Sequence, residues 1–109
     1  GDAEGGNACD ITVTYPLAGD VSCPSLPPTI TWTPENWTHF KVFVGWNANF
    51  TFKFTSGRRL LTTPQWTPPT TKWNLACAGA NPNVYVKIKG KIKGKKGSEE
   101  SEVTIVPVK

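Results

Sequence analysis

Apolar and polar residues alternate with a period of two along two proline-free stretches of the chain, 35–63 and 83–106. In the first stretch, apolar residues occupy every second position from Phe40 to Trp46 and again from Phe50 to Phe54. In the second, the alternation runs from Val84 to Ile92, with glycine at one inward position. A period of two is typical of a half-buried β-strand, whereas an amphipathic helix needs apolar residues three and four positions apart. Both stretches therefore predict antiparallel strands.

Three shorter segments add to the predicted strands: Asp10–Tyr15, Thr29–Thr33 and Thr71–Ala76. Clusters rich in Pro, Gly, Asn and Ser separate the segments at intervals of about ten residues, as expected of turns. After one such turn at 94–98, Val103 and Ile105 are expected to continue as the last strand. Seven short strands with this spacing predict an all-β fold, a seven-stranded antiparallel two-sheet sandwich, with an open barrel as the alternative.

Four of the five tryptophans bear on the predicted core. Trp32 and Trp46 share strand faces with apolar neighbours, and Trp73 lies in step with Leu75 and Cys77 on an expected strand, so all three are expected to be buried. Trp66 lies in a proline-rich stretch. Its side chain is expected either to plug the edge of the sandwich or to stand exposed as a platform for sugars.

The length of 109 residues suits one domain with one core. Residues 1–9 are rich in glycine and are expected to form a flexible lead-in to a single domain over 10–109. Ten prolines and many β-branched residues disfavour helix almost everywhere. Since no run of about 20 apolar residues occurs, no membrane-spanning helix is expected.

Four segments fit the strands and bends of one known kind of sandwich. Tyr15–Gly19 has a Pro-to-Gly bend after a first strand, Thr29–Pro34 has a central tryptophan, and Phe40–Val44 and Val84–Gly90 match a third and a sixth strand. In these features the chain resembles, over about 10–108, the fibronectin type III-like, immunoglobulin-like modules of bacterial surface and secreted proteins. The resemblance implies their seven-stranded fold, but it implies little about function, because such folds have many activities.

The chain contains three cysteines, Cys9, Cys23 and Cys77, whose spacing matches neither a zinc site nor a redox pair. In the fold implied by the resemblance, the loops after the first and fifth strands meet at one pole, and these loops contain Cys23 and Cys77. The resemblance thus implies a Cys23–Cys77 disulfide, worth about 3–4 kcal/mol in the chain-entropy picture. A disulfide indicates an extracellular, cell-surface or periplasmic location, whereas three reduced thiols would indicate the cytosol.

Catalytic residue patterns are poorly represented in the sequence. His39 is the only histidine, and its parity places it on the outer face of a strand, where a solvated side chain is expected rather than a catalytic base. One histidine with dispersed carboxylates does not make a typical zinc site, and no glycine-rich phosphate loop precedes a helix. We therefore expect no catalysis, no cofactor and no metal ion. A small enzyme ranks third, after the two non-catalytic functions given below.

The net charge of +4 is unevenly distributed, because six of the twelve basic residues lie between Lys87 and Lys96. In the implied fold the third and sixth strands are neighbours, and their outward residues share a face with those of the fourth strand. Aromatic rings beside lysines can bind sugars, phosphate, sulfate or uronate. This candidate ligand face consists of Trp37, Lys41, Phe43, Lys53, Tyr85, Lys87, Lys89 and Lys91.

The alternative is that the lysines only keep an exposed sheet solvated and are neutralised by nearby acids. The group Glu99–Glu102 could pair with Lys91 and Lys93 across the hairpin. Lys95 and Lys96, at the hairpin tip, form a separate candidate loop. Two Asn-X-Thr sequons, at Asn36 and Asn49, matter only in a source that glycosylates.

The first functional hypothesis is a non-catalytic extracellular interaction, adhesion or spacer module of a surface or secreted protein. Its partners would be another protein or the neighbouring domains of a longer chain. The alternative is a carbohydrate- or polyanion-binding domain that uses the candidate ligand face for an anionic glycan or cell-surface polymer. Specific nucleic-acid binding is not expected, since there is no recognition helix and the charge outside 87–96 roughly cancels.

Overall fold

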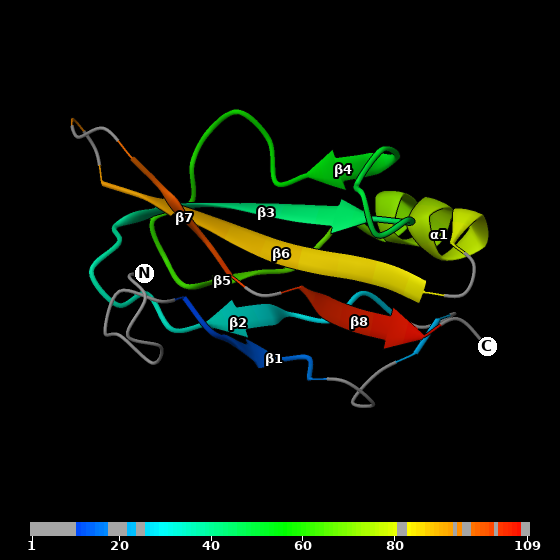
Figure 1. The fold of residues 1–109 in the computed structure, drawn as a ribbon. Coiled ribbons are helices and arrows are strands. Elements are labelled where there is room, and N and C mark those ends of the chain that lie inside the picture. The colour runs from blue at the N-terminus through cyan, green and yellow to red at the C-terminus, as the bar shows by residue number, and fades with distance from the viewer. Residues whose placement is uncertain are drawn as a thin grey trace.

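The computed structural model describes residues 11–17, 22–23, 26–80, 83–92, 94, 97–101 and 103–107. These residues form two antiparallel sheets and one α-helix (Figure 1). The elements in chain order are β1 (Val13–Tyr15), β2 (Ile30–Trp32), β3 (His39–Gly45), β4 (Lys53–Thr55), β5 (Gln65–Trp66), α1 (Thr70–Gly79), β6 (Asn83–Lys91), β7 (Glu99–Glu100) and β8 (Thr104–Pro107). One sheet has the order β1-β2-β5, and the other has the order β4-β3-β6 with both β7 and β8 on the far edge of β6. The expected architecture of two antiparallel sheets is confirmed, but the chain is mostly β and not all-β, because it also contains α1.

The core lies between the two sheets and is built from alternate residues of the long strands. Val42 of β3 pairs with Ile88 of β6, and neither side chain is exposed. From the three-stranded sheet, the ring of Trp32 meets that of Phe40 edge-on, with centroids 5.5 Å apart. The period of two therefore predicted correctly which residues of β3 and β6 face inward.

The main departure from the predicted fold is α1, which stands where a strand over Thr71–Ala76 was expected. Residues three and four positions apart share one face of a helix, and this spacing relates the residues buried by the helix and its C-cap: Trp73, Ala76, Cys77 and Ala80. Leu75, which a strand would have placed beside Trp73, is 61% exposed. The burial of Trp73 was predicted correctly, but from the wrong element.

The strand β5 occupies part of the proline-rich stretch that was expected to form only a turn. Trp66 of β5 pairs with Ile30, and its ring is partly buried against the core. The ring lies 6.4 Å from that of Phe54, which belongs to β4 in the other sheet. Trp66 thus closes the gap between the sheets, which is the edge plug and not the exposed platform.

A β-bulge interrupts the edge of the five-stranded sheet and divides the expected last strand into β7 and β8. Lys89 pairs with Glu100 and Val86 with Thr104, so β6 advances by three residues (89 − 86 = 3) while its partner advances by four (104 − 100 = 4). Beside the bulge, the Ser101 hydroxyl accepts a hydrogen bond of 2.9 Å from the Ile88 N–H. Three changes separate the observed strands from the predicted ones: the last strand is divided, β5 is added, and α1 replaces one strand. The described residues therefore form eight strands instead of seven.

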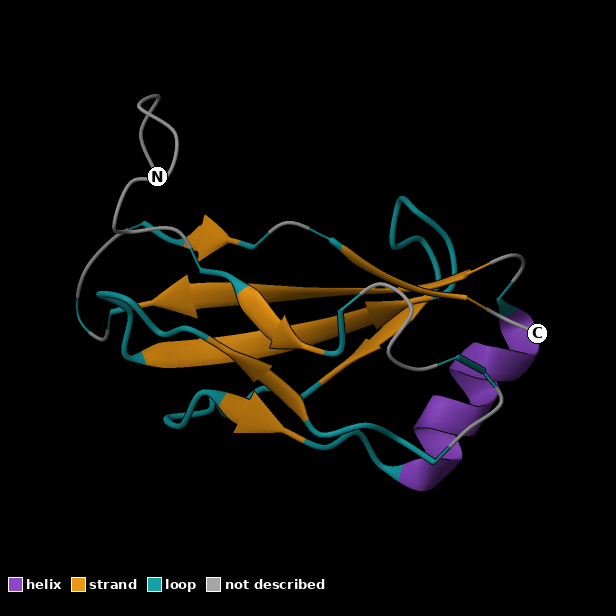
Figure 2. Ribbon diagram, turned by 90° about the horizontal axis from the view of Figure 1, so that it is seen from below, coloured by secondary structure: helices purple, strands orange, loops and turns teal. Residues whose placement is uncertain are grey.

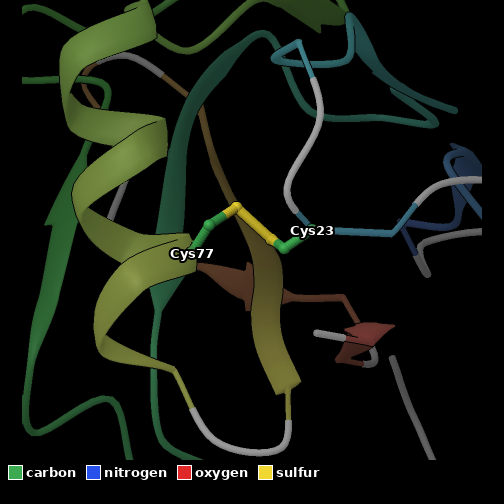
Figure 3. Close-up of a disulfide and its surroundings, with 2 residues drawn as sticks. All are labelled: Cys23 and Cys77. Carbon is green, nitrogen blue, oxygen red and sulfur yellow. A yellow bond between two sulfur atoms is a disulfide. The ribbon is translucent and has the colours of Figure 1, made fainter. Parts of the chain in front are cut away.

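The predicted Cys23–Cys77 disulfide is present and closes 54 positions of sequence. Figure 3 shows the bond joining the last turns of α1 to the segment that follows β1. Cys77 lies within the helix, however, and not in a loop after a fifth strand. Figure 2 shows α1 lying obliquely across one end of the strands, so the bond fastens the helix at that pole. Cys9 lies outside the described residues.

Candidate functional site

The outer side of the five-stranded sheet presents the alternate residues that do not face the core. On this side Lys41 pairs with Lys89 and Phe43 with Lys87 across β3 and β6. Gly45 of β3 pairs with Tyr85 of β6 on one side and with Lys53 of β4 on the other. The structure therefore brings most of the expected ligand face together, namely Lys41, Phe43, Lys53, Tyr85, Lys87, Lys89 and Lys91.

Trp37 does not belong to this outer face, contrary to the prediction. It packs against the core, and a Cβ built on Gly90 would lie 2.9 Å from the Trp37 Cβ. Gly90 pairs with Phe40 in the inward row, so Trp37 covers the inner side of the sheet. The prediction failed because β3 begins at His39 and Trp37 lies before it in a turn. In that turn the Trp37 N–H donates to the Pro34 carbonyl at 2.9 Å.

Phe50 belongs to the outer face, although the alternation placed it on a strand with Phe52 and Phe54. Its φ of +56° turns the chain, and its ring lies over Gly45, where an added Cβ would come 2.6 Å from the ring. The ring also meets Tyr85 edge-on with centroids 6.5 Å apart. The signal in the sequence was a glycine within a strand, which often marks a close approach of another group.

Lys87 is the central cation of the outer face. Its Nζ lies 4.6 Å from the centroid of the Phe50 ring and 5.4 Å from that of Phe43. The same Nζ is 3.3 Å from Glu100 Oε1, and the Lys87 side chain is 21% exposed. Glu100 therefore pairs with Lys87, which was not among the lysines expected to pair with the Glu99–Glu102 group. A partly exposed pair of this kind contributes about 0–1 kcal/mol. Lys93 and Glu102, on which part of that expectation rests, lie outside the described residues.

The remaining candidate residues are distributed differently. Lys41 Nζ lies 5.7 Å from the Phe43 centroid. The side chains of both sequon residues, Asn36 and Asn49, are exposed. The candidate loop Lys95–Lys96 lies outside the described residues.

A pocket of about 540 Å³ lies where the outer face reaches the pole opposite α1. Three segments form it: the start of β3, the loop between β4 and β5, and the end of β6 with the residues after it. Its lining consists of His39, Arg59, Leu60, Thr62, Lys91, Ile92 and Gly94. Lys91 was expected on the outer face, whereas Arg59 was not among the predicted site residues, because no local pattern links its loop to β3.

Paired backbone hydrogen bonds hold the loop against β3. The N–H groups of Phe40 and Leu61 each donate to the other residue's carbonyl at 2.8 Å. Nearer β4, the Ser56 N–H donates to the Val42 carbonyl at 3.0 Å, and the Ser56 hydroxyl accepts from the Val42 N–H at 2.9 Å. Arg59 lies between these two anchors, which place it beside His39.

Within the described residues, no three His, Cys, Asp or Glu side chains form a group suited to a metal ion. The described part of the chain also contains no helix long and apolar enough to cross a bilayer. Comparison of the chain with protein-family models, with curated proteins and with solved structures finds no match. The function must therefore be inferred from the geometry and chemistry of the chain itself.

Proposed function

We propose that the chain is a non-catalytic interaction or spacer module of an exported surface or secreted protein, with a fibronectin type III-like architecture. The main support is the position of the two ends of the described fold. The side chain of Ile11 lies against Gly90 near the end of β6, whereas Pro107 pairs with Asn83 at its start. Seven residue steps of a strand separate these places, a distance of about 23 Å. Flanking segments would therefore leave from opposite poles and hold neighbouring domains apart.

The disulfide supports the exported location in this proposal. Disulfides persist in oxidising compartments and are rare in cytosolic proteins. The Cys23–Cys77 bond connects a helix to a segment 54 positions away in the sequence. A module exposed outside the cell benefits from such a bond, because it restricts the unfolded chain.

The spacer role is tested with two copies of the chain joined in series by a short linker and measured by small-angle X-ray scattering. Because entry and exit lie at opposite poles, we expect a maximum dimension close to twice that of the single chain. The single chain, measured under the same conditions, is the control. A tandem pair that folds back to the dimension of one copy would contradict the spacer role.

Polyanion binding by the outer face is the second candidate function, and the row of lysines across β3 and β6 is the observation that favours it. Lys41 and Lys89 are paired on adjacent strands and flank the Phe43–Lys87 contact. Their ammonium groups could bind sulfate or uronate groups of a glycan while the rings contact its sugars. Lys87 itself is partly satisfied by Glu100.

This second function is tested by elution of the protein from heparin resin with increasing salt. The double variant K41S/K89S should elute at clearly lower salt than the unchanged chain. The variant R58S/K72S, which removes the same charge from exposed positions off the face, should elute close to the unchanged chain. Equal shifts for both variants would show a response to net charge alone and would contradict binding by this face.

A further inference from the structure

We infer that the pocket at the pole opposite α1 binds an acidic saccharide unit, meaning a sugar-sized ligand that carries one oxyanion group. This inference goes beyond the proposed function, because neither a spacer nor the open outer face requires a pocket. It rests on the charge of the pocket lining, the way the lining is held, and the size of the space.

Two cationic side chains and one imidazole reach the pocket lining from three directions. His39 comes from β3, Arg59 from the loop between β4 and β5, and Lys91 from β6. No described acidic side chain lines the pocket, and among the described residues neither Arg59 nor Lys91 forms an ion pair. A guanidinium offers a planar pair of donors that matches the two oxygens of a carboxylate, sulfate or phosphate, and an ammonium adds a point charge.

The backbone that carries the lining is held in place before any ligand arrives. The hydrogen bonds between Phe40 and Leu61 fix the loop beside β3, as described above. The Thr38 N–H donates to the Lys91 carbonyl at 3.0 Å and holds the end of β6 to the start of β3. The Thr38 Oγ1 lies 2.8 Å from His39 Nδ1, which occupies that ring nitrogen and leaves Nε2 for a ligand. A prearranged lining lowers the entropy cost of binding.

The volume and the remaining walls indicate more than a bare ion. About 540 Å³ lies within the range of roughly 300–1,000 Å³ that is typical of small-molecule sites. Leu60 and Ile92 are half-buried and offer apolar walls for the C–H groups of a sugar ring, and Thr62 contributes a hydroxyl. This combination fits a sugar with a sulfate, phosphate or carboxylate substituent.

The test is a calorimetric titration of the whole chain with glucose 6-sulfate, glucose 6-phosphate and glucuronate, with glucose as the uncharged comparison. We expect at least one acidic sugar to bind and glucose to bind at least about tenfold more weakly, as expected for loss of a charged hydrogen bond. The three acids distinguish which oxyanion the pocket prefers. Failure of all three to bind, or equal binding of glucose, would overturn the inference.

Matched variants locate the binding. R59A and K91S should each weaken binding of the preferred acid by about tenfold or more. R58A, from the same loop, and K72S, from the exposed side of α1, remove the same charges outside both the pocket and the outer face and should change the Kd by less than about twofold. Equal weakening by pocket and control variants would overturn the pocket as the site. Circular dichroism of each variant confirms that it is folded, and loss of heparin binding in K41S/K89S with unchanged sugar binding would separate the two surfaces.

Discussion

At the α1 pole the sandwich is closed by a helix whose Trp73 side chain is fully buried and whose Cys77 is bonded to Cys23. At the opposite pole, the ends of β3 and β6 leave a pocket lined by His39, Arg59 and Lys91. The first pole places apolar groups and a covalent bond against the core, whereas the second leaves cationic groups at the surface. The difference indicates that stability and recognition are concentrated at opposite ends, so substitutions should separate them.

The largest expected effect is that of Trp73→Ala at the closed pole. Removing a fully buried indole leaves a cavity beneath α1 and should lower the free energy of unfolding by about 3–5 kcal/mol. Urea unfolding followed by circular dichroism measures the change. Leu75→Ala, on the exposed side of the same helix, is the control and should cost less than about 1 kcal/mol. Similar losses for both variants would mean that α1 does not cover the core as described.

The next effect is that of the disulfide at the same pole. The double variant C23S/C77S should lose about 3–4 kcal/mol of stability, because 54 positions of sequence are no longer closed in the unfolded chain. The measurement is guanidinium unfolding without reductant, with C9S as the control for replacing a thiol. A loss below about 1 kcal/mol would contradict a stabilising role for this bond.

The third prediction compares the loss of stability expected at two phenylalanines, one buried on the outer face and one exposed. Phe50 is 7% exposed over Gly45, whereas Phe52 is 60% exposed and stacks on Trp46 with centroids 6.5 Å apart. Phe50→Ala should cost about 3 kcal/mol, at the lower end of the range for buried phenylalanine, and Phe52→Ala less than about 1 kcal/mol. Thermal unfolding of the two variants gives the order, and the reverse order would refute the placement of Phe50.

The smallest expected effect on the stability of the protein comes from substitutions in the pocket at the pole opposite α1. R59A and K91S should each change the free energy of unfolding by no more than about 0.5 kcal/mol, because surface substitutions of this kind seldom do more. The same urea curves measure this. A loss above about 1 kcal/mol would show that these side chains support the fold, and the separation of stability from recognition would fail.

Local periodicity predicted the parts of the fold in which a strand continues for several residues. The inward rows of β3 and β6 and the burial of Trp32 follow from alternation alone. The helix was missed because Trp73, Leu75 and Cys77 also fit a period of two. The competing spacing of three and four, from Trp73 through Ala76 to Ala80, is also present, but it was not considered because the proline-rich, β-branched composition disfavours helix.

The candidate site was predictable only where a strand fixed the register. Lys41 and Lys89 are opposite one another because β3 and β6 pair continuously. Trp37 was misplaced because the alternation was extended past the start of β3. Arg59 was not predicted as a site residue because its position depends on the pairing of Leu61 with Phe40. No local sequence pattern predicts this contact between two separate segments.

The separation of the two poles is tested most directly by nuclear magnetic resonance of the isotopically labelled chain during titration with glucose 6-sulfate. We expect amide shift changes confined to the pole opposite α1, around His39, Arg59 and Lys91, with the amides of α1 unchanged. Changes centred on α1, or spread evenly along the lysine row of β6 with none around Arg59, would contradict this separation.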